Sequence, residues 1–118
     1  MDLEIKDKQE IKMKIIAYTN TPDALKKAID KKISSNETKT WEIVFNKKNE
    51  ALYSHSPEQW KEKAMLKPYI HENILEFRIS WWNKNEEPNE ETKGYILGRF
   101  VEILIVHFKE KFTHLEIR

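Results

Sequence analysis

One stretch, ILEFRISWW at residues 74–82, constrains the fold more than any other part of the sequence. Apolar side chains occupy every second position in it: Leu75, Phe77, Ile79 and Trp81. Neighbouring side chains on a strand point to opposite faces of a sheet, so this row predicts a strand with one face on a core. The same parity places Trp81 inside and predicts that Trp82 is exposed on the outer face.

Alternating apolar positions predict further strands at residues 11–18, 41–46, 51–55 and 112–118. In the first, we expect the core-facing residues Ile11, Met13, Ile15 and Ala17. In the second, we expect Trp41, Ile43 and Phe45 to face the core. Tyr18, Val44 and His114 then fall on the outer rows of their strands.

Capping residues predict three helices. Thr21 followed by Pro22 predicts a helix that begins at Pro22 and buries Leu25, Ile29 and Ile33. Ser56 and Gln59 form the pattern of a capping box, which predicts a short helix over residues 57–66. Thr92 is expected to cap a long helix from residue 93 to 111, in which Gly98 lets the helix approach the sheet closely.

These elements give the order β-α-β-β-α-β-α-β. The prediction is an α+β fold: a single mixed or antiparallel sheet of about five strands, with two main helices and one short helix on one face. A chain of 118 residues has the size of one domain. We therefore expect one domain over residues 11–118, preceded by a segment, residues 1–10, that is frayed or forms a short extra strand.

Composition excludes several classes of function. The chain has no cysteine, which excludes disulfides and thiolate chemistry and fits a cytoplasmic protein. Its most apolar segment, residues 95–108, contains Arg99 and Glu102, so no membrane span is expected. The net charge is only +1, and the lysines near residues 26–32 are diluted by Asp23 and Asp30, so nucleic-acid binding is not expected.

No catalytic motif is present. The four histidines lack the close paired spacing of metal ligands, and no serine lies in a Gly-x-Ser-x-Gly elbow. The sequence therefore predicts no catalytic residue, no metal site and no cofactor.

The outer row of the 74–82 strand and the loop after it indicate a binding surface. We expect Trp82, Arg78 and Tyr18 on an open sheet face, beside a loop that is rich in acidic residues: Glu86, Glu87, Glu90 and Glu91. Aromatic residues commonly anchor protein interfaces, and concentrated charge steers a partner of opposite sign. The leading interpretation is a non-catalytic module that binds another protein, one with a basic surface. A bacterial immunity protein that neutralises a toxin is an example of this class.

Two alternatives remain open at this level. A sheet face or edge carrying Tyr18, Val44 and Trp82 could pair with a second copy to form a homodimer. A small-ligand pocket or a small enzyme could instead be built near Tyr53, His55, Trp60 and His71, where polar aromatic residues gather in the sequence.

Overall fold

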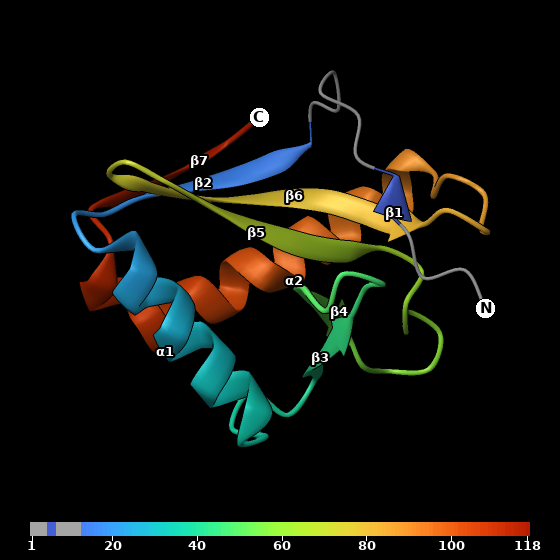
Figure 1. The fold of residues 1–118 in the computed structure, drawn as a ribbon, viewed down its shortest axis with the longest axis horizontal. Coiled ribbons are helices and arrows are strands. Elements are labelled where there is room, and N and C mark those ends of the chain that lie inside the picture. The colour runs from blue at the N-terminus through green and yellow to red at the C-terminus, as the bar shows by residue number, and fades with distance from the viewer. Residues whose placement is uncertain (1–4, 7–12) are drawn as a thin grey trace.

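A computed structural model describes residues 5–6 and 13–118 (Figure 1). Its strands are β1 (Ile5–Lys6), β2 (Lys14–Tyr18), β3 (Trp41–Phe45), β4 (Ala51–His55), β5 (Met65–His71), β6 (Ile74–Trp82) and β7 (His114–Ile117). Its helices are α1 (Pro22–Ser34), α2 (Glu90–Phe108) and the short 3-10 helix η1 (Lys109–Lys111). The predicted frayed segment, residues 1–10, lies outside the described residues except for the two in β1, and the predicted strand positions 11 and 12 also lie outside them.

The sheet is antiparallel throughout, and six of its strands follow the order β3-β4-β5-β6-β2-β7. Strand β6 pairs with β5 along most of its length and with β2 over residues 74–78. Where β2 no longer pairs with it, β1 does, with Ile5 opposite Trp82. The α+β class is therefore confirmed, with more strands than predicted.

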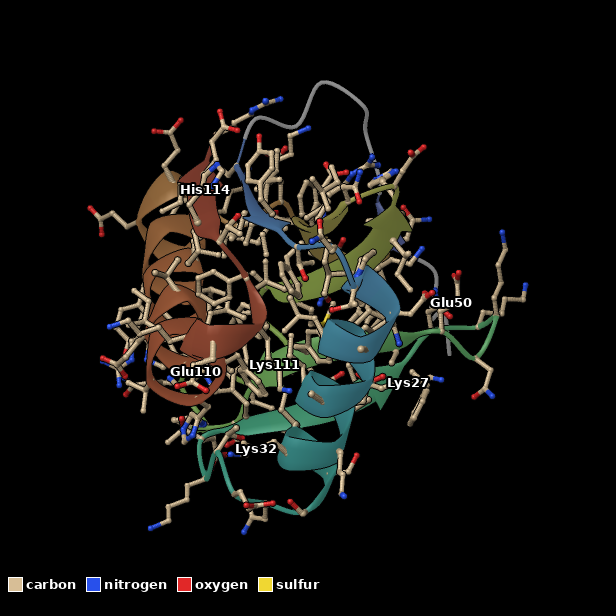
Figure 2. The ribbon with its side chains drawn as sticks, turned by 90° about the vertical axis from the view of Figure 1, so that its left-hand side faces the viewer. Lys27, Lys32, Glu50, Glu110, Lys111 and His114 are labelled. Carbon is tan, nitrogen blue, oxygen red and sulfur yellow. The ribbon has the colours of Figure 1, made fainter. Side chains whose placement is uncertain are left out.

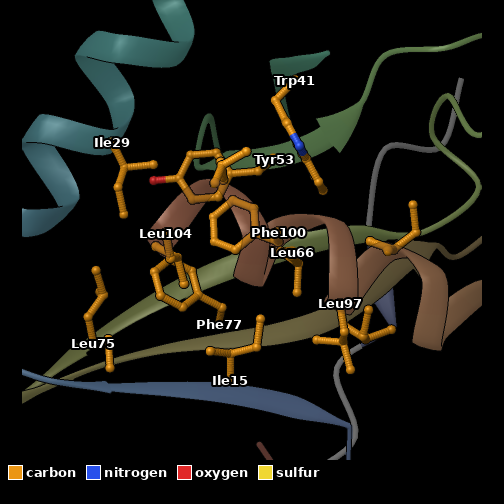
Figure 3. Close-up of a cluster of buried hydrophobic side chains, with 14 of the residues drawn as sticks. Ile15, Ile29, Trp41, Tyr53, Leu66, Leu75, Phe77, Leu97, Phe100 and Leu104 are labelled. Carbon is orange, nitrogen blue, oxygen red and sulfur yellow. The ribbon is translucent and has the colours of Figure 1, made fainter. Parts of the chain in front are cut away.

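Both long helices lie on one face of the curved sheet (Figure 1), and the main core fills the space between them and the sheet. Aromatic rings form its centre (Figure 3): Phe100 of α2 stacks on Tyr53 with ring centres 5.5 Å apart and meets Phe77 at 4.9 Å. The core-facing residues of β6 are almost fully buried, as their alternation predicts: Leu75, Phe77, Ile79 and Trp81.

The predicted short helix over residues 57–66 is wrong. Residues 58–63 form turns, and β5 begins at Met65. The amides of Trp60 and Lys61 both bond to the carbonyl of Pro57, but Glu62 then adopts a positive φ of 55°, which an α-helix cannot continue. Its amide bonds instead to the Ser54 hydroxyl at 3.0 Å, so tertiary contact ends the turn.

Pro68 lies inside β5 opposite Phe77. Strand β4 pairs with β5 only at Met65 and Leu66, so Pro68 occupies a part of β5 that has a described strand on one side only. Proline is tolerated in a sheet at such edge positions because the missing N–H is not needed for the ladder.

Four further predictions are corrected. Thr21 makes no side-chain cap, and α2 is capped by Asn89 rather than Thr92, because the Asn89 side chain accepts the amide of Thr92 at 2.8 Å. A methyl group added at Gly98 would meet no described atom within 4 Å, so this glycine makes no close helix–sheet contact. Phe45, predicted to face the core, is 52% exposed and lies at the tip of the β3–β4 hairpin, opposite Ala51.

Candidate functional site: the open face of the sheet

The sheet face turned away from α1 and α2, here called the open face, carries the outward rows of β5, β6, β2 and β7. No described helix covers it (Figure 1). Two of the predicted binding residues, Arg78 and Tyr18, lie on it as expected. The registers of β2 and β6 with their neighbours bring together outward residues from four strands: Lys67, Tyr69, Glu76, Arg78, Lys14, Tyr18, His114 and Glu116.

Glu76 lies at the centre of this face and is only 4% exposed. Three cationic or titratable groups from three strands surround its carboxylate: Lys14 at 3.0 Å, Arg78 at 3.0 Å and His71 at 2.8 Å. Burial by itself would raise the pKa of Glu76, but hydrogen bonds from Arg78, Lys14 and His71 outweigh it and lower the pKa to about 2. The carboxylate therefore stays charged and joins β5, β6 and β2. We call these four residues the Glu76 network.

Tyr69 of β5 lies beside this network. The guanidinium carbon of Arg78 is 4.2 Å from the centre of its ring, and the ammonium of Lys67 is 4.5 Å from it. Both cations are thus held against an aromatic ring, an arrangement that limits their freedom to reorient. The result is an aromatic ring held in place on the face by cations from two strands.

A second group lies toward β7. The Tyr18 hydroxyl donates to Glu116 at 2.6 Å, and the Tyr18 ring stacks on His114 with centres 4.1 Å apart. The hydrogen bond from Tyr18, reinforced by Arg118, lowers the pKa of Glu116, and the same bond raises the pKa of Tyr18. Two tyrosines, Tyr18 and Tyr69, are therefore presented on one face in fixed orientations.

Trp82 lies on the face that its parity predicts, but the expectation that it is exposed is wrong. It is only 3% exposed and packs with Leu52, Met65 and Val44 in a second, smaller core on that face. Its indole N–H donates to the Glu62 carboxylate at 2.7 Å. Val44, Leu52 and Met65 all occupy outward positions in their strands, and that apolar outward row is the sequence signal that could have indicated burial.

An open groove of about 550 Å³ adjoins Trp82. It runs between the turn at residues 61–63 and the loop that follows β6, and it is lined by Lys61, Glu62, Lys63, Trp82, Lys84, Asn85, Glu86, Pro88 and Thr92. Trp82 and Glu86, two of the predicted binding residues, both line this groove. Three lysines line the groove as well, so it is not the purely acidic surface expected from the sequence.

The remaining acidic residues are divided between different roles. The Glu87 carboxylate lies 2.5 Å from the ammonium of Lys93, which is itself buried against Trp81. Glu90 and Glu91 form the first turn of α2, where negative side chains stabilise the positive end of the helix. Glu86, Glu90 and Glu91 are exposed, so the loop after β6 and the start of α2 keep an acidic surface.

The structure does not gather the four residues of the predicted pocket. The Tyr53 hydroxyl donates to Asp30 at 2.5 Å, inside the main core, and burial raises the pKa of Tyr53 well above its ordinary value. His55 is buried between Trp41 and Tyr95, and burial lowers its pKa, so it is neutral. Trp60 stacks on Tyr95, while His71 lies on the opposite face of the sheet in the Glu76 network.

Within the described ranges, no three acidic or histidine side chains are placed to hold a metal ion, and no helix is long and apolar enough to span a membrane. No family model matches the chain, and no curated protein or solved structure proved similar to it.

Proposed function

We propose that this protein is a non-catalytic module that binds another protein through the open face of its sheet. The observation that carries the proposal is the Glu76 network together with Tyr69 and Tyr18: polar and aromatic side chains held in place by one another on a face that no described helix covers. Tyrosine and arginine are the residues that interfaces favour, and side chains already held in position lose little entropy on binding.

The charge on this face favours a protein over a nucleic acid. Glu76 neutralises part of the charge of Lys14 and Arg78, and Glu116 does the same for Arg118. Nucleic-acid affinity depends on cations that are free to replace the counterions of phosphates. Cations already paired with carboxylates serve better as hydrogen-bond donors in a polar protein interface.

The exposed glutamates of the loop after β6 and of the start of α2 favour a partner with a basic surface. Glu86, Glu90 and Glu91 would attract a basic partner and raise the rate of association. An immunity-type protein that covers a basic toxin would use its surface in this way, and we propose that class as the narrower form of the function.

The first test compares binding by three forms of the chain. Affinity capture from native cell extract, followed by calorimetry with the purified partner, is carried out with wild type, with Tyr18→Ala/Tyr69→Ala and with Lys27→Ala. Lys27 lies on α1, away from the open face (Figure 2), and provides the matched control. We expect the double variant to bind at least about tenfold more weakly, a loss of about 1.4 kcal/mol, and Lys27→Ala to bind like wild type. Equal binding by both variants would exclude the open face.

A second comparison tests the acidic loop. Replacing Glu86, Glu90 and Glu91 by glutamine should slow association with the same partner and reduce its dependence on salt, with little change in dissociation. Glu87 is left unchanged in this variant because it pairs with Lys93. An association rate equal to that of wild type would remove the loop from the mechanism while leaving the open face in it.

A further inference from the structure

The outer edge of β7 is a free strand edge. Lys14 and Arg118 exchange two backbone hydrogen bonds, both of 2.9 Å, so the backbone groups of Arg118 point toward β2. Because these groups alternate along an antiparallel strand, the N–H and C=O groups of Leu115 and Ile117 point the other way. Within the described part of the chain β7 pairs with β2 alone, so these groups face outward without a partner strand.

An apolar surface lies beside this edge. Tyr95 of α2 contacts His55 of β4, and Arg99, one turn further along α2, is near enough for its charge to act on the same histidine. The flank of α2 that carries Tyr95 and Arg99 therefore faces β4. Successive side chains on an α-helix are about 100° apart around its axis. Val101 and Ile105 therefore lie on the flank of α2 opposite to Tyr95 and Arg99, on the side of β2 and β7.

The surface is formed by residues from both elements. Val101 and Leu115 are partly buried and pack on the rim of the main core. Ile105 is 49% exposed and Ile117 is 60% exposed. We call Val101, Ile105, Leu115 and Ile117 the β7 flank.

We infer that a second copy of this chain docks here, with the two β7 strands paired antiparallel about a two-fold axis at Leu115. In this register Leu115 meets its own copy, and His114 of each chain lies opposite Glu116 of the other. Both residues occupy outward positions on the open face, so each pair joins an imidazole to a carboxylate across the new strand pair. Moving the two-fold axis by one residue, to Glu116, would instead place Glu116 opposite its own copy, which like-charge repulsion disfavours.

The strand pair by itself is too small for a stable dimer, since specific interfaces bury about 1,200 Å² or more in total. The β7 flank supplies the missing apolar contact. A two-fold axis perpendicular to the sheet puts both copies of α2 on the same face of the joined sheet, so that Ile105 and Ile117 of one chain approach those of the other. The central part of the open face, around Tyr69 and Arg78, stays free for the proposed partner.

Cross-linking tests the register directly. The chain has no cysteine, so Leu115→Cys introduces a single thiol. Across a hydrogen-bonded antiparallel pair the two Cα atoms would lie about 5.5 Å apart, within the range of a disulfide. We expect Leu115→Cys to form a covalent dimer under mild oxidation and Val106→Cys, a thiol on the exposed side of α2, to form little. Equal cross-linking of the two variants would overturn the register.

Sedimentation equilibrium tests the interface without a cysteine. Wild type is expected to be dimeric at about 100 µM. The double variant Ile105→Glu/Ile117→Lys is expected to have a dimer dissociation constant at least about tenfold higher. Val106→Glu is the control, because Val106 is 68% exposed and lies off the β7 flank. Circular dichroism confirms that each variant folds.

Two results would overturn the inference. One is a wild type that remains monomeric at this concentration. The other is a wild type that forms open-ended larger species, which would show that β7 pairs with a different edge, such as β3, in a head-to-tail manner.

Discussion

At the scale of single residues, the indole of Trp82 shows how an outward tryptophan becomes a core residue. It lies on the face opposite the helices, yet only 3% of its surface is exposed because Leu52 and Met65 pack beside it and Glu62 accepts its N–H. A buried indole with its polar atom paired retains the full benefit of burial. Trp82 is therefore a structural residue that forms one wall of a groove.

This burial predicts the cost of removing the side chain. Trp82→Ala should lower the free energy of unfolding by about 3 kcal/mol or more, close to the effect of Trp81→Ala. Phe45→Ala, at a side chain that is 52% exposed, is the control and should cost clearly less. Urea unfolding followed by circular dichroism measures all three, and a Trp82→Ala effect as small as that of Phe45→Ala would contradict the second core.

The carboxylate of Glu76 gives a prediction about pH. Its pKa falls from an ordinary 4.5 to about 2 in the folded chain, so its ion pairs stabilise the fold above pH 4.5 and the contribution is lost as the pH falls toward 2. Glu76→Gln should therefore lower the free energy of unfolding at neutral pH by about 1–2 kcal/mol, a figure reduced for the solvent that reaches Lys14 and Arg78.

Urea unfolding at a series of pH values checks this prediction. The stability curves of wild type and Glu76→Gln should converge as the pH approaches 2. Glu72→Gln, in the exposed turn between β5 and β6, is the control and should follow wild type at every pH. A Glu76→Gln deficit of the same size at pH 2 and pH 7 would mean that packing, and not charge, accounts for the effect.

At the scale of elements, the segment between β4 and β6 shows local signals overruled by tertiary contact. The sequence SPEQW has the residues of a helix start, and its first turn does form hydrogen bonds to Pro57. Trp60 then stacks on Tyr95 with ring centres 4.1 Å apart, and Met65 pairs with Ser80 of β6. A continued helix would forfeit both the aromatic contact and the strand pairing, so the segment turns and becomes β5.

Helix α2 begins at a cap that lies one turn before the residue predicted from the sequence, Thr92. The Asn89 side chain accepts the amide of Thr92 at 2.8 Å, whereas Thr21 makes no such bond at the start of α1. Asn89→Ala should lower the free energy of unfolding by about 1 kcal/mol, and Thr21→Ala, the matched control, by less than half of that. Thermal unfolding of both variants measures the difference, and equal losses would contradict the assignment of the cap.

At the scale of the whole molecule, the two halves of the sheet are joined unequally. Strand β6 pairs with β5 and β2 over residues 74–78, whereas the β3–β4 hairpin pairs with β5 only through Tyr53 and Ser54. Side chains such as Trp41 and Tyr53, packed on Phe100, carry the rest of the connection. The hairpin is therefore held mainly by the core and little by the backbone ladder.

Hydrogen exchange should report this asymmetry. We expect the slowest amides in β6, between Leu75 and Ile79, and faster exchange in β3, which has one described neighbour. Exchange measured by mass spectrometry on the native chain, with residues 41–45 compared to 75–79, checks it. Protection in β3 equal to that in β6 would show that the hairpin and the central strands open as one unit.

Particular residues show which features of the fold and of the open face were determined by the sequence and which by tertiary contacts. The alternation from Leu75 to Trp81 determined β6 and its buried row, because a two-residue period leaves a strand only one way to face a core. The absence of cysteine excluded disulfides and thiolate chemistry. The positions of Arg78 and Tyr18 on the open face followed from the same parity. Tertiary structure alone decided that β5 replaces a helix, that Trp82 is covered, and that Glu76 gathers Lys14, His71 and Arg78. These contacts join residues from separate strands, and no local pattern encodes which strands become neighbours.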